Sequence, residues 1–333
     1  MELSLLDVIK QNRLDIVTDL LNRNADIETK GENNETPLHI AVSYGRLDIV
    51  ILLLNRNANI MAMDIRGETP LSCSIMSNSR AFLMKEKTSD IVIELLNRNA
   101  NIETKNIHGE TPLHIASQDG NKDIVVELLN RNANIEAIDK YDRTPLHIAS
   151  KVGHKETVIE LLNRNANINM KGEFERTPLH IVSGTASSYD DYRDIVTLLL
   201  NRNADVTIID EDGRTPLHCA SHGGDMRIIQ ELLEYNADIM ATDNDGMTPY
   251  DIALENCYVD RILELLEPKD IMVEKNSEYI NTLVKRITCN ICSVNEIKIV
   301  FECGHFTCKS CSKKMFKCKV CNSYISNRIK LHF

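Results

Sequence analysis

The 333-residue sequence has no tryptophan, only 13 glycines and eight prolines, and no apolar run near the ~18 residues that a membrane-spanning helix needs. The scarcity of glycine and proline excludes a collagen-like or low-complexity chain. With 43% hydrophobic and 26% charged residues, the composition is that of a folded protein with a buried core. The opening segment, MELSLLDVIKQNRLDIV, lacks the basic and then apolar stretch of a secretory signal. We therefore expect an intracellular, cytoplasmic protein that has no membrane partner.

Cysteine is scarce before residue 289. Seven of the ten cysteines lie between Cys289 and Cys321. Residues 287–333 carry eight Lys or Arg against two Glu, whereas the first 286 residues have a net charge of −17. In a chain without an export signal, clustered cysteines favour a bound metal over disulfides. The sequence therefore predicts a long acidic module and a small metal-rich one.

The long module is an internal repeat. A Thr-Pro-Leu-His-like tetrad recurs at intervals of 33, 42, 33, 33, 38 and 33 residues, and an Asn-Ala pair recurs at the same intervals. The tetrads begin at Thr36, Thr69, Thr111, Thr144, Thr177, Thr215 and Thr248. Two markers in one register indicate a 33-residue repeat with insertions in the third and sixth copies.

Each repeat has the pattern of two helices and a turn. In residues 111–143, Thr111 is placed to cap a helix and Pro112 to occupy its first position, where the missing N–H costs nothing. This helix is expected to stop near Gly120, and a second amphipathic helix to end at Asn132, because asparagine tolerates the left-handed conformation that terminates helices. The residues equivalent to Asn132 are Asn24, Asn57, Asn99, Asn165, Asn203 and Asn236.

This repeat resembles the ankyrin repeat, and the resemblance covers residues 3–267 with eight copies. The first and last copies are degenerate, as expected of the ends of a stack. The near-verbatim Leu-Leu-Asn-Arg-Asn-Ala segments are similar to those of ankyrin proteins from giant DNA viruses, which would place the protein in a virus-infected host cell. The fold implied for residues 1–267 is a mostly α ankyrin-repeat solenoid.

Several residues of the repeats have a structural explanation. The tetrad histidines could suggest a metal site, but the resemblance explains them as hydrogen-bonding groups between neighbouring repeats. Cys73 and Cys219 occupy the position of a core isoleucine, so we expect small core residues, and the same is expected of Cys257. The turn at residues 172–176 is expected to be distorted, because Glu175 stands where other repeats have Gly, Asn or Asp.

Ankyrin repeats are known as protein-binding scaffolds, in which turn tips and first helices line one concave face. Carried over by position, this implies a substrate-protein site at Tyr44, His108, Gln118, Asp119, Tyr141, Lys151 and Phe174. Exposed aromatic residues are typical binding hot spots. The alternative that these are incidental surface residues stays open.

The metal-rich module has the spacing C-x2-C-x10-C-x-H-x2-C-x2-C-x6-C-x2-C over residues 289–321. Thiolate and imidazole ligands in two sets of four favour two structural zinc ions. Because so short a segment buries little apolar surface, we expect its folding to depend on the metal. The eight predicted ligands are Cys289, Cys292, Cys303, His305, Cys308, Cys311, Cys318 and Cys321.

This spacing resembles the RING finger, assigned here to residues 287–333, with a linker over 268–286 that is either a short helix or a flexible tether. The resemblance implies interleaved ligands, with Cys289, Cys292, Cys308 and Cys311 on one ion and the other four on the second. Ile299-Val300-Phe301, the Cys-Gly-His at 303–305 and the C-terminal tail are similar to the RINGs of inhibitor-of-apoptosis proteins. In that subgroup the tail pairs two RINGs, so a homodimer through residues 322–333 is a hypothesis.

RING domains of this kind bind a ubiquitin-loaded conjugating enzyme, and the family's docking surface is matched by Ile291 and Met315. Two positions depart from the family pattern. Lys319 replaces the usual proline, and Asn322 replaces the Arg or Lys that bridges enzyme and ubiquitin. These departures put the strength of the activity in doubt.

The two resemblances together predict a ubiquitin ligase whose repeats bind a substrate protein and whose RING recruits the conjugating enzyme, with no covalent intermediate and no catalytic side chain of its own. The alternative is a non-catalytic ankyrin adaptor whose RING is structural or dimerising. Nucleic-acid binding by the basic tail is disfavoured, because metal-bound thiolates offset much of its charge and aromatic residues are not interleaved for stacking.

Overall fold

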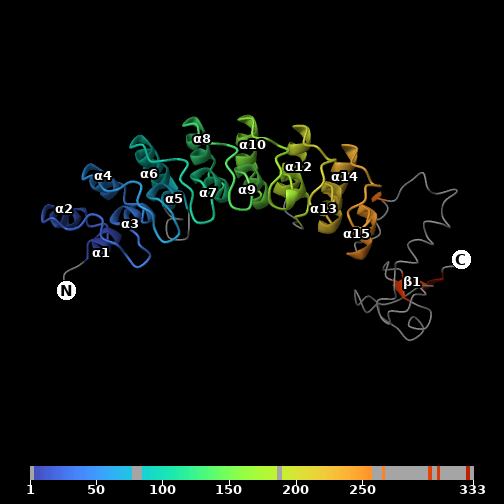
Figure 1. The fold of residues 1–333 in the computed structure, drawn as a ribbon, viewed down its shortest axis with the longest axis horizontal. Coiled ribbons are helices and arrows are strands. Elements are labelled where there is room, and N and C mark those ends of the chain that lie inside the picture. Colours follow the sequence, from blue (N-terminus) through green and yellow to red (C-terminus); the bar gives the residue numbers. More distant parts are fainter. Residues whose placement is uncertain are drawn as a thin grey trace. The chain divides into compact units, whose positions relative to one another are not determined.

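A computed structural model of the chain describes residues 4–76, 85–185, 190–256, 265–266, 299–301, 306–307 and 328–330. The described part consists of helices and three short strands, as shown in Figure 1. The chain divides into two compact units. The first unit comprises Met1–Val182 and Asp190–Ala204, and the second comprises Ser183–Tyr189 and Asp205–Phe333.

The first unit is built of helix pairs joined by loops. Its helices are α1 (Leu5–Lys10), α2 (Leu14–Asn22), α3 (Pro37–Ser43), α4 (Leu47–Asn55), α5 (Pro70–Ile75), α6 (Lys85–Asn97), α7 (Pro112–Asp119), α8 (Lys122–Asn130), α9 (Pro145–Val152), α10 (Lys155–Asn163), α11 (Pro178–Ser183, whose last residue belongs to the second unit) and α12 (Asp190–Asn201). A short 3-10 helix, η1 (Glu173–Glu175), precedes α11.

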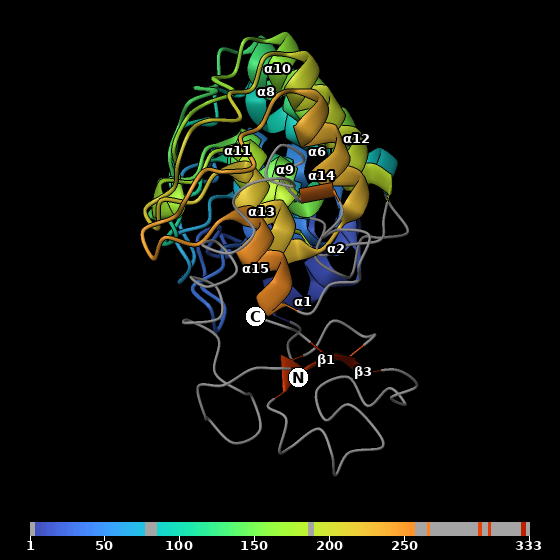
Figure 2. The ribbon, with the colours of Figure 1, turned by 90° about the vertical axis from the view of Figure 1, so that its right-hand side faces the viewer.

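These helices form two layers. In one layer α1, α3, α5, α7 and α9 contact one another in sequence, and in the other α2, α4, α6, α8, α10 and α12 do the same. The apolar positions predicted from the repeat at residues 111–143 are buried, including Leu113 in α7 and Leu128 in α8. The loops of the first unit lie to one side of its helices (Figure 2). The predicted ankyrin-repeat solenoid is therefore confirmed.

The ends of the helices follow the sequence signals closely. The Thr111 side chain and the His114 side chain form a capping box, with Pro112 in the first turn. Gly120 is left-handed at the end of α7. The second helix ends at Asn130, two residues before the predicted Asn132, because the chain leaves the helix through Arg131 before the left-handed residue is reached. The predicted left-handed asparagines all have φ between 61° and 65°.

The Leu-Leu-Asn-Arg-Asn-Ala segments owe their uniformity to a hydrogen-bond ladder on the second helices. In each case the arginine that follows a helix donates to the side-chain oxygen of the asparagine that ends the helix of the preceding repeat. The bonds join Arg56 to Asn22 (2.7 Å), Arg98 to Asn55 (2.7 Å), Arg131 to Asn97 (2.7 Å), Arg164 to Asn130 (2.8 Å) and Arg202 to Asn163 (2.9 Å). The first Asn and the Arg therefore act between repeats, whereas the second Asn acts within its own.

The second unit contains α13 (Pro216–Gly223), α14 (Met226–Glu234) and α15 (Pro249–Glu255), together with three strands. Strands β1 (Ile299–Phe301), β2 (Phe306–Thr307) and β3 (Arg328–Lys330) form an antiparallel sheet in the order β2-β1-β3. Val300 pairs with Phe306 on one side and with Ile329 on the other. The predicted linker at 268–286 and Cys257 lie outside the described residues.

The two predicted core cysteines differ. Cys219 is buried as expected, but Cys73 is only half-buried. It lies in α5, which directly precedes the insertion in the third repeat. Burial, together with the carboxylates of Asp64 and Glu68, raises the pKa of the Cys73 thiol. The thiol therefore stays protonated at neutral pH, and a protonated thiol is a poor nucleophile.

The tetrad histidines join neighbouring repeats. The Nδ1 atom of His147 accepts the backbone N–H of Thr144 (3.1 Å), and its Nε2 donates to the carbonyl of Arg176 in the next repeat (3.0 Å). The equivalent Nε2 bonds run from His39 to Glu68, from His114 to Arg143 and, in the second unit, from His218 to Met247. The histidines are structural hydrogen-bonding groups, as predicted.

The third repeat is the exception among the tetrads of the first unit. Its tetrad has Ser72 in place of histidine. Ser72 is buried, and its hydroxyl lies 3.3 Å from the Thr69 hydroxyl of the same repeat. The serine side chain is too short to span the gap to the next repeat. The side chain of Asn106 makes a different connection, donating to Glu68 (2.8 Å) and to Glu110 (2.9 Å).

We expect acid to destabilise the repeats before it protonates most carboxylates. Burial lowers the pKa of His39, His114, His147 and His218, that of His147 to about 4. Above pH 6.5 these side chains are neutral in both the folded and the unfolded chain and contribute no pH dependence. Below pH 6.5 the histidines of the unfolded chain bind protons, whereas those of the folded chain stay neutral until the pH is lower. The free energy of unfolding should therefore fall between pH 6.5 and 4, by about 2 kcal/mol at pH 5 from His147 alone. Urea unfolding followed by helical circular dichroism measures this, and a His147→Gln variant should show a smaller slope. An unchanged unfolding free energy from pH 7 to 5 would contradict it.

Candidate protein-binding surface

Short hairpin segments precede the tetrads, and we call them fingers. In the first unit the fingers are residues 31–35, 64–68, 106–110, 139–143 and 172–176; in the second unit they are residues 210–214 and 243–247. In each finger the backbone N–H of the first residue donates a hydrogen bond to the backbone carbonyl of the last residue. In the finger at 139–143, the Asp139 N–H donates to the Arg143 carbonyl (3.1 Å). The fingers are thus tight loops held by their own backbone.

A buried side chain fixes most fingers from within. The Oδ1 atom of Asp139 accepts the backbone N–H groups of Tyr141 (2.8 Å) and Arg143 (2.9 Å), and Asp64 and Asn106 do the same in their fingers. Burial alone would raise the pKa of Asp139, but hydrogen bonds from the Arg143 side chain and from these N–H groups hold it below its usual value. The fingers therefore present a preorganised backbone.

Neighbouring fingers are joined at their tips by backbone hydrogen bonds. The backbone N–H of Ile65 donates to the backbone carbonyl of Asn33 (3.0 Å). In the same way Ile107 donates to the carbonyl of Arg66 (2.9 Å), and Lys140 donates to the carbonyl of His108 (3.0 Å). A continuous edge of the first unit thus runs from the finger at 31–35 to the finger at 139–143. Its tips expose Ile65 (60%), Ile107 (58%) and Tyr141 (42%).

The finger at 172–176 is distorted, as predicted. Gly172, like Gly31 in the finger at 31–35, stands where the remaining fingers have an Asp or Asn, so this finger lacks the internal anchor. Both Phe174 (φ 59°) and Glu175 (φ 56°) are left-handed, and residues 173–175 form η1. This turn projects Phe174, which is 50% exposed and has the Arg176 guanidinium 5.6 Å from its ring centre.

The predicted binding residues fall into separate groups. His108 and Tyr141 lie on adjacent finger tips, and Phe174 lies on the next finger. The Nζ atom of Lys140 lies 3.0 Å from His108 Nδ1 and 5.1 Å from the Tyr141 ring centre, so it links the two side chains. The Arg143 guanidinium lies 4.9 Å from the same ring centre.

The remaining predicted residues lie at helix ends. Gln118 and Asp119 end α7, Lys151 lies in the last turn of α9, and Tyr44 follows α3. Gln118 and Lys151 are exposed, whereas Asp119 and Tyr44 are half-buried. The structure therefore offers a finger-tip surface and a separate set of helix-end residues, with Tyr44 next to a pocket near α1.

Sequence reasoning missed Ile65, the most exposed of the large apolar side chains at the finger tips. A signal was present, because Ile65 stands four residues before its tetrad, as Ile107 does. Because aliphatic residues are less typical hot spots than aromatic ones, this position alone does not predict a binding residue. The pocket near α1 was also missed, because the first repeat has no tetrad to set its register.

The structure does not describe the residues predicted for the metal-rich module. All eight predicted ligands and the four predicted docking residues, Ile291, Met315, Lys319 and Asn322, lie outside the described ranges. Within those ranges, no three His, Cys, Asp or Glu side chains are grouped so that they could hold a metal ion. Likewise, none of the helices described has both the length and the apolar character that membrane crossing requires.

Comparison with protein families identifies both modules. The family described as Ankyrin repeats (3 copies) matches residues 5–83, 80–172 and 179–278, which is more than half of the chain. The family described as Zinc finger, C3HC4 type (RING finger), matches residues 285–328. The donor set agrees with that description, because the seven cysteines and one histidine in this order are of the residue types that bind zinc.

The curated relatives are similar over short segments. The E3 ubiquitin-protein ligase MIB2 of Gallus gallus is 37% identical over 68 residues, 20% of this chain and 7% of that protein. The E3 ubiquitin-protein ligase RGLG4 of Arabidopsis thaliana is 42% identical over 45 residues, 14% of this chain and 11% of that protein. The human Baculoviral IAP repeat-containing protein 3 is 30% identical over 78 residues, 23% of this chain and 13% of that protein. The chain thus matches only about a tenth of the length of these relatives.

The distorted finger yields a prediction about stability. Replacing Glu175 by asparagine should raise the free energy of unfolding by about 0.5–1 kcal/mol, because asparagine tolerates the left-handed backbone at lower cost. The exposed ion pair between Lys171 and Glu175 (2.8 Å) contributes little that would be lost. Glu175→Gln is the matched control, since it removes the same charge but keeps the strain. Equal urea midpoints for the two variants at pH 7 would show that strain is not the cause.

Proposed function

The chain belongs to the ankyrin-repeat family and carries a C3HC4-type RING finger, and from this pairing we propose that it acts as a ubiquitin ligase. The repeats would bind a substrate protein, and the RING would hold a ubiquitin-loaded conjugating enzyme inside the cell. The observation that carries the proposal is the presence of a RING match at residues 285–328 on the same chain as an exposed apolar finger edge. The similarity to segments of two proteins named as ubiquitin ligases supports it.

The finger edge supports the role of the repeats in binding. Ile65, Ile107 and Tyr141 are exposed on a backbone that its own hydrogen bonds hold in place. A preorganised apolar surface loses little conformational entropy on binding. The substrate site that we propose therefore combines these tips with Phe174 and His108, and extends to the helix-end residues Gln118, Asp119 and Lys151.

The RING needs no acid, base or nucleophile of its own in this proposal. It holds the conjugating enzyme so that a substrate lysine meets the thioester in a productive geometry, which is catalysis by positioning. We propose that Ile291 and Met315 contact the enzyme and that Asn322 replaces a charged contact to ubiquitin by a hydrogen bond. The zinc ions cross-link residues 287–333 and stabilise their fold, because closed four-ligand sites are structural.

We propose two zinc ions per chain. Cys289, Cys292, Cys308 and Cys311 would bind one ion, and Cys303, His305, Cys318 and Cys321 the other. Elemental analysis of the purified full-length protein should give two zinc equivalents, and Cys308→Ser should lower the zinc content. Cys73→Ser is the control, because its thiol lies in the repeats and should leave the zinc content unchanged. A content well below two equivalents in a chain that transfers ubiquitin would contradict the assignment.

Ubiquitin transfer tests the proposed activity. With a panel of conjugating enzymes, the full-length protein should attach ubiquitin to itself, and Ile291→Ala should reduce the rate about tenfold by removing an apolar contact to the enzyme. Ile93→Ala is the matched control, because Ile93 is an exposed isoleucine of α6 in the repeats. No transfer with any enzyme would contradict the proposal.

The same assay separates a ligase from a non-catalytic adaptor with a dimerising RING. Asn322→Arg restores the charge that the RING pattern usually has at this position. If the natural chain is inactive and Asn322→Arg is active, the chain is an adaptor with a RING that has lost its activity. A natural chain that is already active, with at most a few-fold gain in the variant, is the result we expect.

A further inference from the structure

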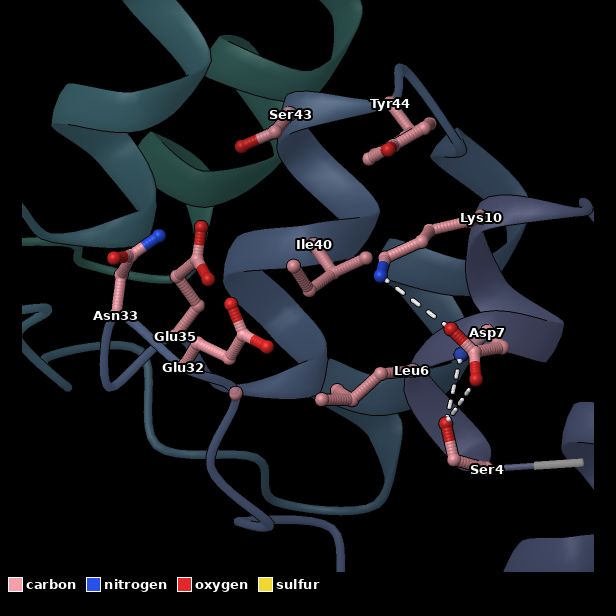
Figure 3. A pocket seen from close by; sticks show the side chains of 11 residues that line it. Ser4, Leu6, Asp7, Lys10, Glu32, Asn33, Glu35, Ile40, Ser43 and Tyr44 are labelled. Carbon is pink, nitrogen blue, oxygen red and sulfur yellow. Dashed lines mark hydrogen bonds and ion pairs between the residues drawn. The ribbon is translucent and has the colours of Figure 1, made fainter.

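A pocket in the first unit lies beside the finger at 31–35, where the finger edge begins. It has a volume of about 570 Å3, within the range of roughly 300–1,000 Å3 that is usual for ligand sites. It is enclosed by α1, by the finger at 31–35 and by α3. Figure 3 shows Glu32 and Glu35 on one side, Asp7 and Lys10 on the other, and Ile40 between them.

The two sides of the pocket differ in charge balance. Asp7 accepts a hydrogen bond from the Ser4 hydroxyl (2.8 Å) and pairs with Lys10 (3.4 Å), and these contacts, the first above all, lower the pKa of Asp7. On the opposite side, neither the Glu32 nor the Glu35 carboxylate makes a hydrogen bond or an ion pair within the described part of the chain. With Lys10 matched to Asp7, the pocket has two surplus negative charges.

The chain shows how it satisfies such a carboxylate elsewhere. Glu35 directly precedes a tetrad, as Glu110 does two repeats later. Glu110 accepts a hydrogen bond from the side chain of Asn106 (2.9 Å) and lies 4.0 Å from the Arg143 guanidinium. In the finger of Glu35 the position of Asn106 is taken by Gly31, which offers no side-chain donor. The fold therefore supplies a hydrogen-bond donor to the Glu110 carboxylate but, within the described residues, none to the Glu35 carboxylate.

The rest of the pocket suits the stem of a long basic side chain. Ile40 is buried, Leu6 is half-buried, and both line the pocket together with Tyr44. Gly31 keeps the finger close to α1, because a Cβ there would lie 3.5 Å from Leu6 Cδ1 and 3.3 Å from Glu35 Oε2. Apolar side chains beneath carboxylates match a methylene stem that ends in a positive charge.

We propose that this pocket binds an arginine side chain from an extended segment of the substrate protein. The guanidinium lies against Glu32 and Glu35, and its methylene groups lie on Leu6 and Ile40. Arginine fits better than lysine because its planar fork can bond two carboxylates and is less strongly hydrated. The assignment of the partner as a substrate rests on the proposed ligase function, whereas the recognition of arginine rests on the pocket alone.

Selection from a random peptide library displayed on phage tests this, with the immobilised full-length protein as bait. Selected peptides should share arginine at one position, and replacing that arginine by glutamine in a synthetic fluorescent peptide should weaken binding about tenfold. The Glu32→Gln/Glu35→Gln variant should weaken binding of the arginine peptide by a similar factor. Glu211→Gln, on an exposed finger of the second unit, is the matched control and should bind the peptide like the parent.

The outcomes separate the pocket from the ligase proposal. Thermal unfolding of the double variant is measured first, and an unchanged midpoint assigns any loss of binding to the carboxylates. No preference for a basic residue, lysine selected as often as arginine, or an arginine preference that survives in the double variant would each overturn the inference. Self-ubiquitination of the parent is measured in parallel. Arginine selection without ubiquitin transfer would contradict only the proposed ligase activity, and ubiquitin transfer without arginine selection would contradict only the proposed arginine pocket.

Discussion

The stacking of most repeats depends on a neutral imidazole at the start of the first helix. His147 shows why a neutral ring is required, because its Nδ1 must accept a backbone N–H while its Nε2 must donate to a carbonyl of the next repeat. Only one neutral tautomer meets both demands. A protonated ring could not accept the first bond, and its charge would be unfavourable in the buried environment. The helix cap, the contact between repeats and the position of the next finger are thus set by a single side chain. The Arg-to-Asn ladder on the second helices adds a parallel connection at the surface.

The finger edge is a consequence of this stacking. Each finger is closed by its own backbone, most are anchored by a buried Asp or Asn, and those from 31–35 to 139–143 are joined to one another through main-chain hydrogen bonds. Side chains at the tips can therefore vary without loss of the scaffold, and Ile65, Ile107 and Tyr141 are displayed in register. The side chains that are displayed and those that stabilise the scaffold are thus different residues of the same repeat, a property that suits such an array to protein binding.

The sequence predicted the parts of the structure that repeat. The threonine caps, the bridging histidines, the left-handed asparagines and the distortion at Phe174 and Glu175 follow from local chemistry compared across copies. The burial of Cys73 was overestimated, because burial depends on the surroundings of a side chain and not only on its place in the repeat. The pocket beside Glu35 was not foreseen for a similar reason. It arises where a degenerate first repeat meets a regular second one, so comparison between copies offers no template for it.

Ser72 gives the array an uneven response to acidity. The interface that follows it is held through the amide of Asn106 and the carboxylate of Glu68 rather than through an imidazole. Burial raises the pKa of the Glu68 carboxyl, so this acceptor takes up a proton at a higher pH than an exposed carboxyl does. The imidazole junctions instead lose their Nδ1 acceptor when the ring is protonated, and burial lowers the pKa of that ring. A single serine thus gives one junction of the array a titrating group that differs from those of its neighbours.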